Sequence, residues 1–115
     1  YRQPGAQKAL INAAFGDWGI PTARNLLDLR ELKGNPLIFA SGGLQNGVDL
    51  AKSLALGAKL GGFARKFLSA ANEGESELIT QIEVIKAQLR AAMFACGVGS
   101  LPEWEINHLE GIEQL

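Results

Sequence analysis

The stretch FASGGLQNG, residues 39–47, decides the fold of this chain. Before it, residues 36–40 form a short apolar run bounded by turn-forming residues, which predicts a buried strand. After it, residues 48–56 have the spacing of a helix that ends at Gly57. The stretch is therefore predicted to lead the chain from a strand into a helix.

Two adjacent glycines, Gly42 and Gly43, give this turn the properties of an anion site. Glycine has no Cβ to block close approach, and the first amides of a helix have no partner within the helix. The helix dipole adds partial positive charge at the same place. A second short apolar run, residues 60–64, ends at Arg65. We predict that the two turns lie side by side and bind one phosphate group.

The segments before the glycine turn carry weaker signals. A helix is predicted over residues 6–14, followed by a very short strand around residues 14–18. Leucines at helical spacing predict a further helix over residues 23–33. Thr22 is expected to cap this helix, and Gly34 is expected to close it.

The segments after the second turn are mostly helical in pattern. We predict a short helix over residues 65–71, a loop over residues 72–74, and a long helix over residues 76–96. The tail, residues 100–115, has a mixed amphipathic pattern. The strongest periodic signal in the chain is one apolar stripe of the long helix: Leu78, Ile82, Ile85, Leu89, Ala92 and Cys96. This stripe is predicted to pack in the core.

Composition limits the possible classes of protein. A chain of 115 residues with 47% hydrophobic residues can bury one core. No apolar run approaches the ~20 residues of a membrane span. A net charge of −1 without a basic stripe argues against nucleic-acid binding. The single Cys96 excludes an internal disulfide, so we predict a reducing, cytoplasmic location. From the hydropathy and the charge together, we predict neither membrane nor nucleic acid as a partner.

The order of strands and helices predicts parallel βαβ units. Two or three strands cannot form a parallel sheet that is covered on both faces, and a complete barrel needs roughly 250 residues. The chain begins with Tyr1, and we expect it to be part of a longer protein. The predicted fold is α/β: residues 1–115 as the C-terminal part of one (β/α)8 TIM barrel domain, about strands six to eight with their helices. Residues 76–115 are predicted to be terminal helices that pack on this barrel.

Several segments together resemble the type 2 isopentenyl-diphosphate isomerases. These are residues 17–23 (DWGIPTA), 40–52 (ASGGLQNGVDLAK) and 54–58 (LALGA), with the pairs 64–65 and 67–68. The ASGG turn alone is shared with many flavin-binding and phosphate-binding barrels, whereas GIPTA is more selective. The resemblance implies an FMN-binding barrel that interconverts isopentenyl and dimethylallyl diphosphate with reduced FMN, Mg²⁺ and NADPH.

The resemblance also implies a set of cofactor-binding residues. Residues 36–40 and 60–64 would be strands seven and eight, and the region near Trp18 would be strand six. Phosphate commonly binds after strands seven and eight of such barrels. Backbone amides in the two turns would bind the FMN phosphate. The six residues that form this site would be Gly42, Gly43, Leu44, Gln45, Ala64 and Arg65.

Two positions depart from the family pattern. Many members carry Arg at the position of Gln45, and Pro is common at the position of Lys66. The substrate, metal and proton-transfer residues would lie upstream of Tyr1, so no catalytic residue and no metal ligand is predicted here. We expect residues 1–115 alone to be inactive and the full-length protein to be a homo-oligomer.

Two other functions stay open at this point. An FMN-dependent oxidase or dehydrogenase of 2-hydroxy acids would share the turn, but such enzymes favour Asp and Arg where Ser41 and Gln45 stand. A non-catalytic α/β interaction module is the third possibility. Outside the turn, His108 is expected to play no catalytic part, and Cys96 is expected to be buried.

Overall fold

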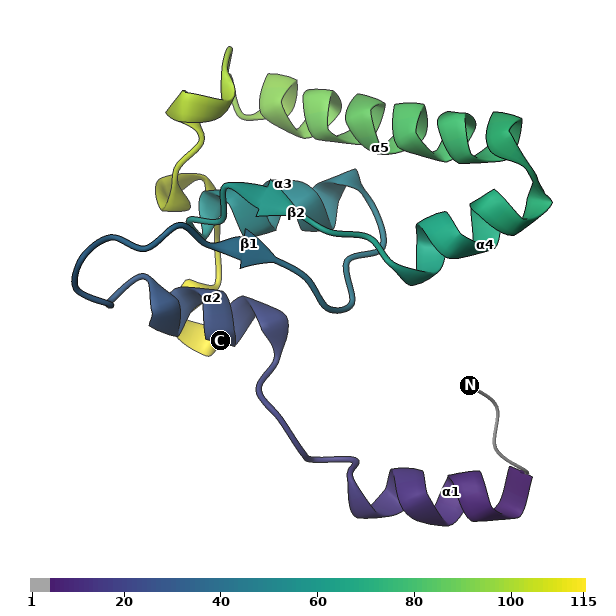
Figure 1. Cartoon of the computed structure of the whole chain (residues 1–115). Coiled ribbons are helices and arrows are strands. Elements are labelled where there is room, and N and C mark those ends of the chain that lie inside the picture. Colours follow the sequence, from purple (N-terminus) through teal and green to yellow (C-terminus); the bar gives the residue numbers. More distant parts are fainter. Residues whose placement is uncertain (1–4) are drawn as a thin grey trace.

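The chain is an α/β protein with a short parallel sheet and helices around it (Figure 1). The computed structural model describes residues 5–115, so the first four residues of the predicted domain, which include Tyr1, lie outside the described residues. The elements in chain order are α1 (Gly5–Ala14), α2 (Thr22–Leu29), β1 (Phe39–Ala40), α3 (Gly47–Ala55), β2 (Leu60–Gly61), α4 (Arg65–Glu73), α5 (Glu75–Ala95), η1 (Leu101–Glu103), η2 (Ile106–His108) and η3 (Ile112–Gln114).

The two strands pair in parallel, as the predicted βαβ unit requires. Phe39 lies opposite Leu60, and Ala40 lies opposite Gly61. On either side of this pair, the Lys59 amide donates to the Ile38 carbonyl at 2.8 Å and the Gly62 amide donates to the Ala40 carbonyl at 2.8 Å. Helix α3 connects β1 to β2, as a parallel crossover demands.

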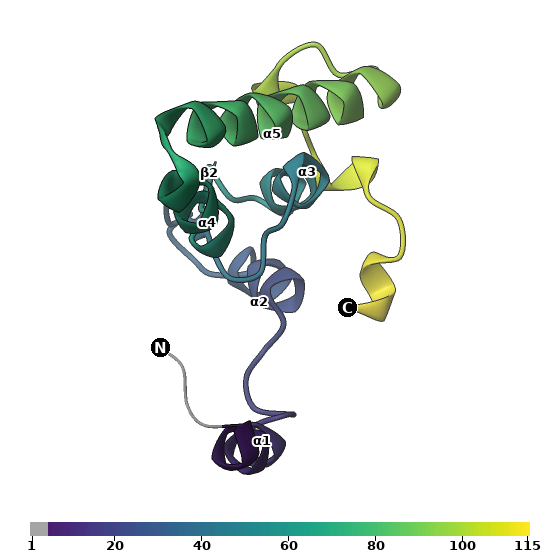
Figure 2. The same ribbon diagram turned by 90° about the vertical axis from the view of Figure 1, so that its right-hand side faces the viewer.

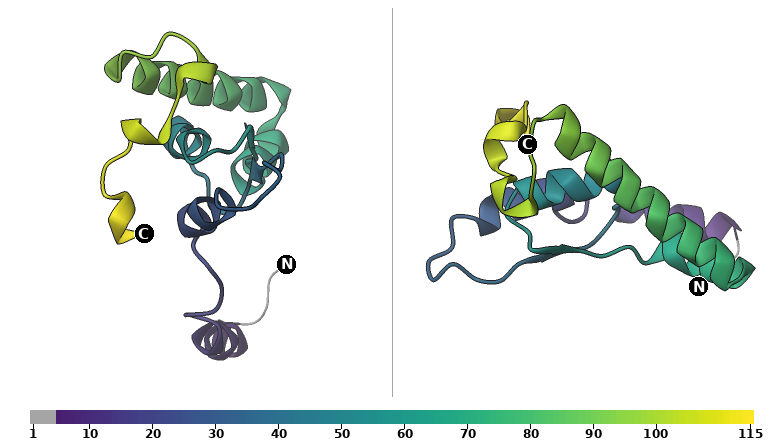
Figure 3. Two further views of the ribbon diagram at one scale, coloured as in Figure 1. Left: turned by 90° about the vertical axis from the view of Figure 1, so that its left-hand side faces the viewer. Right: turned by 90° about the horizontal axis from the view of Figure 1, so that it is seen from above.

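The elements form three tiers. Figures 1 and 2 show α5 on one side and α2 on the other side of a middle tier made of α3 and the two strands. The same order is visible from the opposite side in Figure 3. Helix α3 contacts α5, β2 and α2, whereas α4 contacts α5. The crossover helix is therefore the element that joins the tiers.

Both strands are shorter than the predicted runs 36–40 and 60–64. The predicted burial of the first run is also only partly correct, because Ala40 is buried while Phe39 is 61% exposed. Its partner Leu60 is 51% exposed on the same face of the sheet. Side chains alternate between the two faces of a strand, and helices cover only one face here. The other face of the sheet is open.

The segment before α2 does not contain the predicted strand around residues 14–18. Ala14 ends α1, and a turn follows in which the Trp18 amide donates to the Phe15 carbonyl at 3.1 Å. A strand needs a neighbour to satisfy its amides, and this segment satisfies them locally instead. Helix α1 has no buried residue and stands apart from the other elements (Figure 1).

Helix α2 is shorter than predicted. It ends at Leu29, and the chain continues in turns, with the Leu32 amide donating to the Leu29 carbonyl at 3.2 Å. Gly34 (φ 88°) and Asn35 (φ 49°) both lie in the left-handed region, immediately before Pro36. The predicted break at Gly34 is therefore present, but the helix has already ended.

The C-terminal half follows the prediction more closely. Helix α5 covers nearly the predicted 76–96, and α4 extends two residues past the predicted 71. Only Ile85 of the predicted stripe is fully buried, because α3 and α4 cover only part of it. Cys96 is exposed, so its predicted burial is wrong. Among residues 5–115, no helix has both the length and the apolar character needed to cross a bilayer.

Two small clusters of apolar side chains form the core. One cluster lies between α2 and the sheet and contains Leu26, Ala40, Leu56 and Ala58. The other joins α3 to the tail and contains Ala51, Ala55, Val98 and Trp104. The Trp104 indole N–H donates to the Ala51 carbonyl, which fixes the tail against α3.

The contact between α3 and α5 depends on Gly47. A Cβ on Gly47 would lie less than 3.0 Å from the Ile85 carbonyl oxygen, the Gln88 Cβ and the Leu89 amide nitrogen. The Gly47 amide also donates to the Gln88 side-chain oxygen at 2.8 Å. Glycine is thus the residue that allows the start of α3 to touch α5.

We predict that Gly47→Ala lowers the free energy of unfolding by about 1–3 kcal/mol, because the added methyl group forces α3 away from α5. Urea denaturation measures the change. Gly16→Ala is the matched control, since its Cβ would meet only carbonyl oxygens at 3.7 Å, and it should change stability by less than about 0.5 kcal/mol. Equal midpoints for Gly47→Ala and the unsubstituted protein would contradict the contact.

Candidate functional site

The glycine turn lies between the end of β1 and the start of α3. Gly42 (φ 101°) and Gly43 (φ 79°) both occupy the left-handed region, which side chains with a Cβ rarely adopt. Asn46 caps α3, because its side-chain oxygen accepts from the Asp49 amide at 2.8 Å. The Asp49 carboxylate in turn accepts from the Gln45 amide at 2.9 Å. These bonds fix the C-terminal half of the turn.

Thr22 fixes the other half of the turn from α2. Its hydroxyl donates to the Gly42 carbonyl at 2.7 Å. Thr22 is the first residue of α2, and its side chain makes no capping hydrogen bond, so its predicted role as a helix cap is wrong. A Cβ on Gly42 would lie 3.1 Å from this hydroxyl, which leaves little room for a side chain.

The second turn leaves the sheet beside the first. Because β1 and β2 are parallel and paired, the segments that follow Ala40 and Gly61 begin at the same edge. Gly62, Phe63 and Ala64 lead directly into α4, which begins at Arg65. The two predicted turns are therefore neighbours in space.

The double glycine of the second run has a packing role. A Cβ on Gly61 would collide with the Leu50 side chain and lie 3.2 Å from a Leu44 methyl group. A Cβ on Gly62 would make only ordinary contacts, at 3.6 Å from the Ala40 carbonyl oxygen. The close approach is thus found at Gly61, where α3 and the glycine turn pack against β2.

The candidate residues line two separate hollows. Gly42, Gly43 and Leu44 share a hollow of about 190 Å³ with Thr22 and Lys52. Gln45 and Arg65 line a second hollow, of about 290 Å³, between the glycine turn and α4. The second hollow brings together one residue from each predicted turn. Ala64 precedes α4 and is exposed.

Free backbone amides are concentrated at this edge of the sheet. Within residues 5–115, the amides of Gly43 and Leu44 have no hydrogen-bond partner, nor do those of Arg65 and Lys66 in the first turn of α4. A Cβ on Gly43 would have no atom within 4 Å, so a ligand can approach its backbone. Arg65 and Lys66 add two positive charges to the lining of the second hollow, and Glu73 and Glu77 add two negative charges to it. The free amides and the N-terminal end of α4 are the features that favour an anion.

Two of the contacts at the turn were not predicted from the sequence. One is the hydrogen bond in which the Asp49 carboxylate accepts from the Gln45 amide. The signal for this bond is the spacing of Asn46 and Asp49 around the start of α3, which is typical of a capped helix. The Thr22–Gly42 bond has no sequence signal, because it joins elements that are distant in the chain.

Reactive or metal-binding side chains elsewhere in the described part of the chain include His108. Residues 5–115 contain no group of three or more His, Cys, Asp or Glu side chains placed to hold a metal ion. His108 stacks on Trp104 with ring centroids 5.1 Å apart, and its ring nitrogen Nδ1 lies 3.1 Å from the Glu105 amide nitrogen. These contacts fit a structural role in the tail.

Comparisons with known proteins agree with the resemblance seen in the sequence. The sequence profile described as FMN-dependent dehydrogenase matches residues 17–111. Proteins named isopentenyl-diphosphate delta-isomerase are 46% identical over 98 residues in Synechococcus sp. (85% of this chain, 27% of that protein) and 41% identical over 93 residues in Halobacterium salinarum (81% and 25%). A third, from Nostoc sp., is 35% identical over 114 residues (99% and 32%). The resemblance is thus confirmed, and the chain spans about a quarter to a third of these relatives.

We predict that Thr22→Val lowers the free energy of unfolding by about 0.5–1.5 kcal/mol, because it removes the hydroxyl that binds the Gly42 carbonyl. Valine keeps the shape of threonine, so the change isolates the hydrogen bond. Thr22→Ser keeps the hydroxyl and should retain most of the stability. Urea denaturation compares the three proteins, and a Thr22→Val protein as stable as the original would show that the bond does not hold the turn.

Proposed function

Because this chain belongs to the family of FMN-dependent dehydrogenases, we propose that it binds the phosphate of FMN between its glycine turn and the start of α4. The free amides of Gly43, Leu44 and Arg65 carry this proposal. These amides lie at one edge of the sheet. Those of Gly43 and Leu44 directly follow Gly42 and Gly43, whose positive φ angles favour glycine. A phosphate group carries several oxygen atoms and can accept from more than one backbone amide.

The charges around the turn fit a phosphate of this kind. Arg65 and Lys66 begin α4, where the helix dipole also favours negative charge. The Asp49 carboxylate already accepts from the Gln45 amide, which leaves Gly43 and Leu44 as the amides free for a ligand. Gln45 stands where many relatives of the resembled family have Arg, and Arg65 lines the same hollow from α4. We infer that Arg65 supplies the positive charge that Gln45 lacks.

The chain would form the C-terminal part of a (β/α)8 barrel. On this proposal β1 and β2 are the last two strands, and the exposed Phe39 and Leu60 face the barrel interior. The open sheet face and the quarter to a third of each relative that the chain spans support it. The region near Trp18 is not a strand in this structure, so the proposal does not include a sixth strand there.

The reaction would be the interconversion of isopentenyl and dimethylallyl diphosphate. Bound reduced FMN would supply the proton donor and acceptor for the shift of the double bond. The residues of this chain would hold the cofactor: the free amides bind its phosphate, and Thr22 and Asp49 keep the turn in shape. This part of the barrel would be inactive alone. Requirements for Mg²⁺ and NADPH, a homo-oligomeric state and a cytoplasmic location stay predictions.

A second function is supported by the family description itself, which names dehydrogenases. An enzyme of this kind would remove hydride from a 2-hydroxy acid with the same cofactor. Ser41 and Gln45 stand where such enzymes favour Asp and Arg, and the proteins compared above are named as isomerases. The isomerase is therefore the better supported proposal.

We predict that Gly43→Leu abolishes FMN binding by the intact protein, because the side chain would fill the space that the phosphate needs. Flavin absorbance of the purified protein measures bound cofactor. Gly97→Leu is the matched control, since Gly97 (φ 70°) is equally strained by a side chain and equally open but lies after α5. Retention of FMN by Gly43→Leu, or its loss from both variants, would refute the phosphate site.

The two candidate reactions are separated by one assay of the intact protein. With FMN and a reductant, we expect isopentenyl diphosphate to be converted to dimethylallyl diphosphate, as followed by mass-resolved chromatography. Lactate should leave oxidised FMN unreduced. Rapid bleaching of the flavin by lactate, without isomerisation, would favour the dehydrogenase, and neither reaction would favour a non-catalytic module.

A further inference from the structure

A pocket of about 490 Å³ lies at the opposite end of the sheet from the glycine turn. It is lined by residues 35–38, which lead into β1, and by Lys59, which precedes β2. The end of α2 and the tail from Trp104 to Ile106 complete it. Because parallel strands begin at this edge, the pocket is separated from the proposed FMN phosphate site by the length of the sheet. Its volume is in the range of small-molecule sites.

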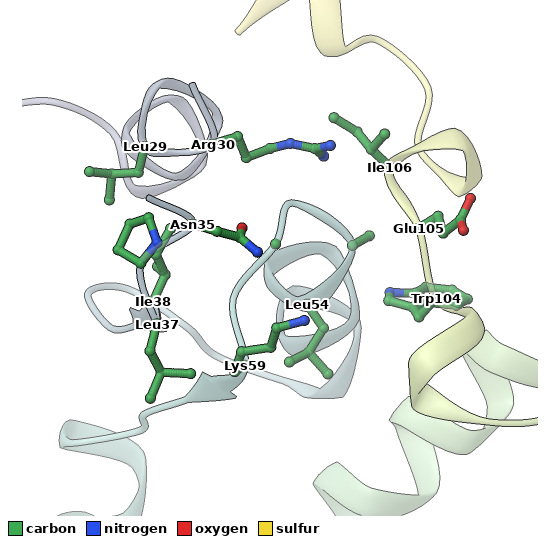
Figure 4. A pocket seen from close by; sticks show the side chains of 13 residues that line it. Leu29, Arg30, Asn35, Leu37, Ile38, Leu54, Lys59, Trp104, Glu105 and Ile106 are labelled. Atoms are coloured by element: carbon green, nitrogen blue, oxygen red, sulfur yellow. The ribbon is translucent and has the colours of Figure 1, made fainter. Parts of the chain in front are cut away.

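Two cations reach into this pocket. Figure 4 shows Arg30 extending from the end of α2 and Lys59 extending from the start of β2 into the same space. Within residues 5–115, neither side chain forms an ion pair. The carboxylate of Glu105, the acidic side chain in the lining, is turned away from the centre of the pocket (Figure 4). The pocket therefore presents uncompensated positive charge.

The position of Arg30 is set by its surroundings. Its aliphatic stem lies across Gly57, where an added Cβ would be 3.5 Å from Arg30 Cγ and 3.9 Å from Cδ. Gly57 follows α3 with a φ of 108°, a conformation that favours glycine, and the Arg30 stem is at ordinary contact distance from it. The stem packs on backbone while the guanidinium faces the pocket.

Apolar side chains form the remaining walls. Leu54 lines the pocket on the side of α3 and Ile106 on the side of the tail, whereas the side chains of Leu29 and Leu37 point away from it (Figure 4). Trp104 lines it on the side of the tail, and its ring is held by the hydrogen bond to Ala51 and by stacking on His108. A ligand that satisfies both the walls and the cations must have a hydrocarbon part and an anionic end.

We propose that this pocket binds a small amphiphilic anion, a short hydrocarbon chain that ends in a phosphate or a carboxylate. The anionic group lies between Arg30 and Lys59, and the hydrocarbon lies against Trp104, Leu54 and Ile106. The site is independent of the proposed cofactor site, since it uses none of the same residues. The protein would thus bind a second ligand, at the edge of the sheet where the strands begin.

Calorimetric titration of the purified protein with hexyl phosphate and hexanoate tests the proposal. Saturable binding of either probe, one molecule per chain, is expected, and the tighter probe identifies the head group. Hexanol and inorganic phosphate each lack one half of the recognised structure and should bind at least about tenfold more weakly. Binding of neither anion, or equal binding of hexanol, would overturn the proposal.

Substitution of the cations makes the test specific. Arg30→Gln with Lys59→Gln should weaken hexyl phosphate binding at least about tenfold, and Lys59→Gln alone, which removes an exposed side chain, should weaken it severalfold. Lys33→Gln is the matched control, because Lys33 is exposed and lies outside the pocket lining. Fluorescence gives a second readout: in a Trp18→Phe protein, where Trp104 is the remaining tryptophan, its emission should change when hexyl phosphate binds. Unchanged affinity in Lys59→Gln and in the double variant would overturn the site.

Discussion

The close packing of α3 against β2 is the constraint on which the rest of the structure depends. Two residues from each strand form the sheet, and so short a ladder cannot align two turns by itself. The alignment comes from Leu50, which fills the space left by the missing side chain of Gly61. On its other side α3 is pressed against α5 through Gly47. The position of the glycine turn follows from these contacts.

Local chemistry explains what the sequence could predict. The βαβ order, the glycine turn, α4 and the long α5 all follow from spacing, glycine and proline, because these signals act within a few residues. Asn46 and Asp49 could also be read in this way, since a cap joins residues close in the chain. The adjacency of the two turns was predictable because parallel strands align their ends.

Contacts between distant segments explain what the sequence could not predict. Thr22 looks like a helix cap in isolation, yet its hydroxyl binds the Gly42 carbonyl. The apolar run before the glycine turn looks like a buried strand, yet Phe39 is exposed because one face of the sheet lacks a cover. Cys96 continues the stripe of α5 beyond the part that α3 and α4 cover. In each case the burial or the contact of the residue depends on the segment that packs against it, and the sequence pattern of a single segment does not identify that partner.

Helix α1 shows the consequence of a helix that buries none of its residues. It has ten residues, none of them buried, and a helix of this length is only marginally stable in water without packing. Its amide hydrogens should therefore exchange with solvent almost as fast as those of an unstructured peptide, while those of α3 are protected. Opening of α1 is therefore expected to occur independently of the unfolding of the unit from α2 onward.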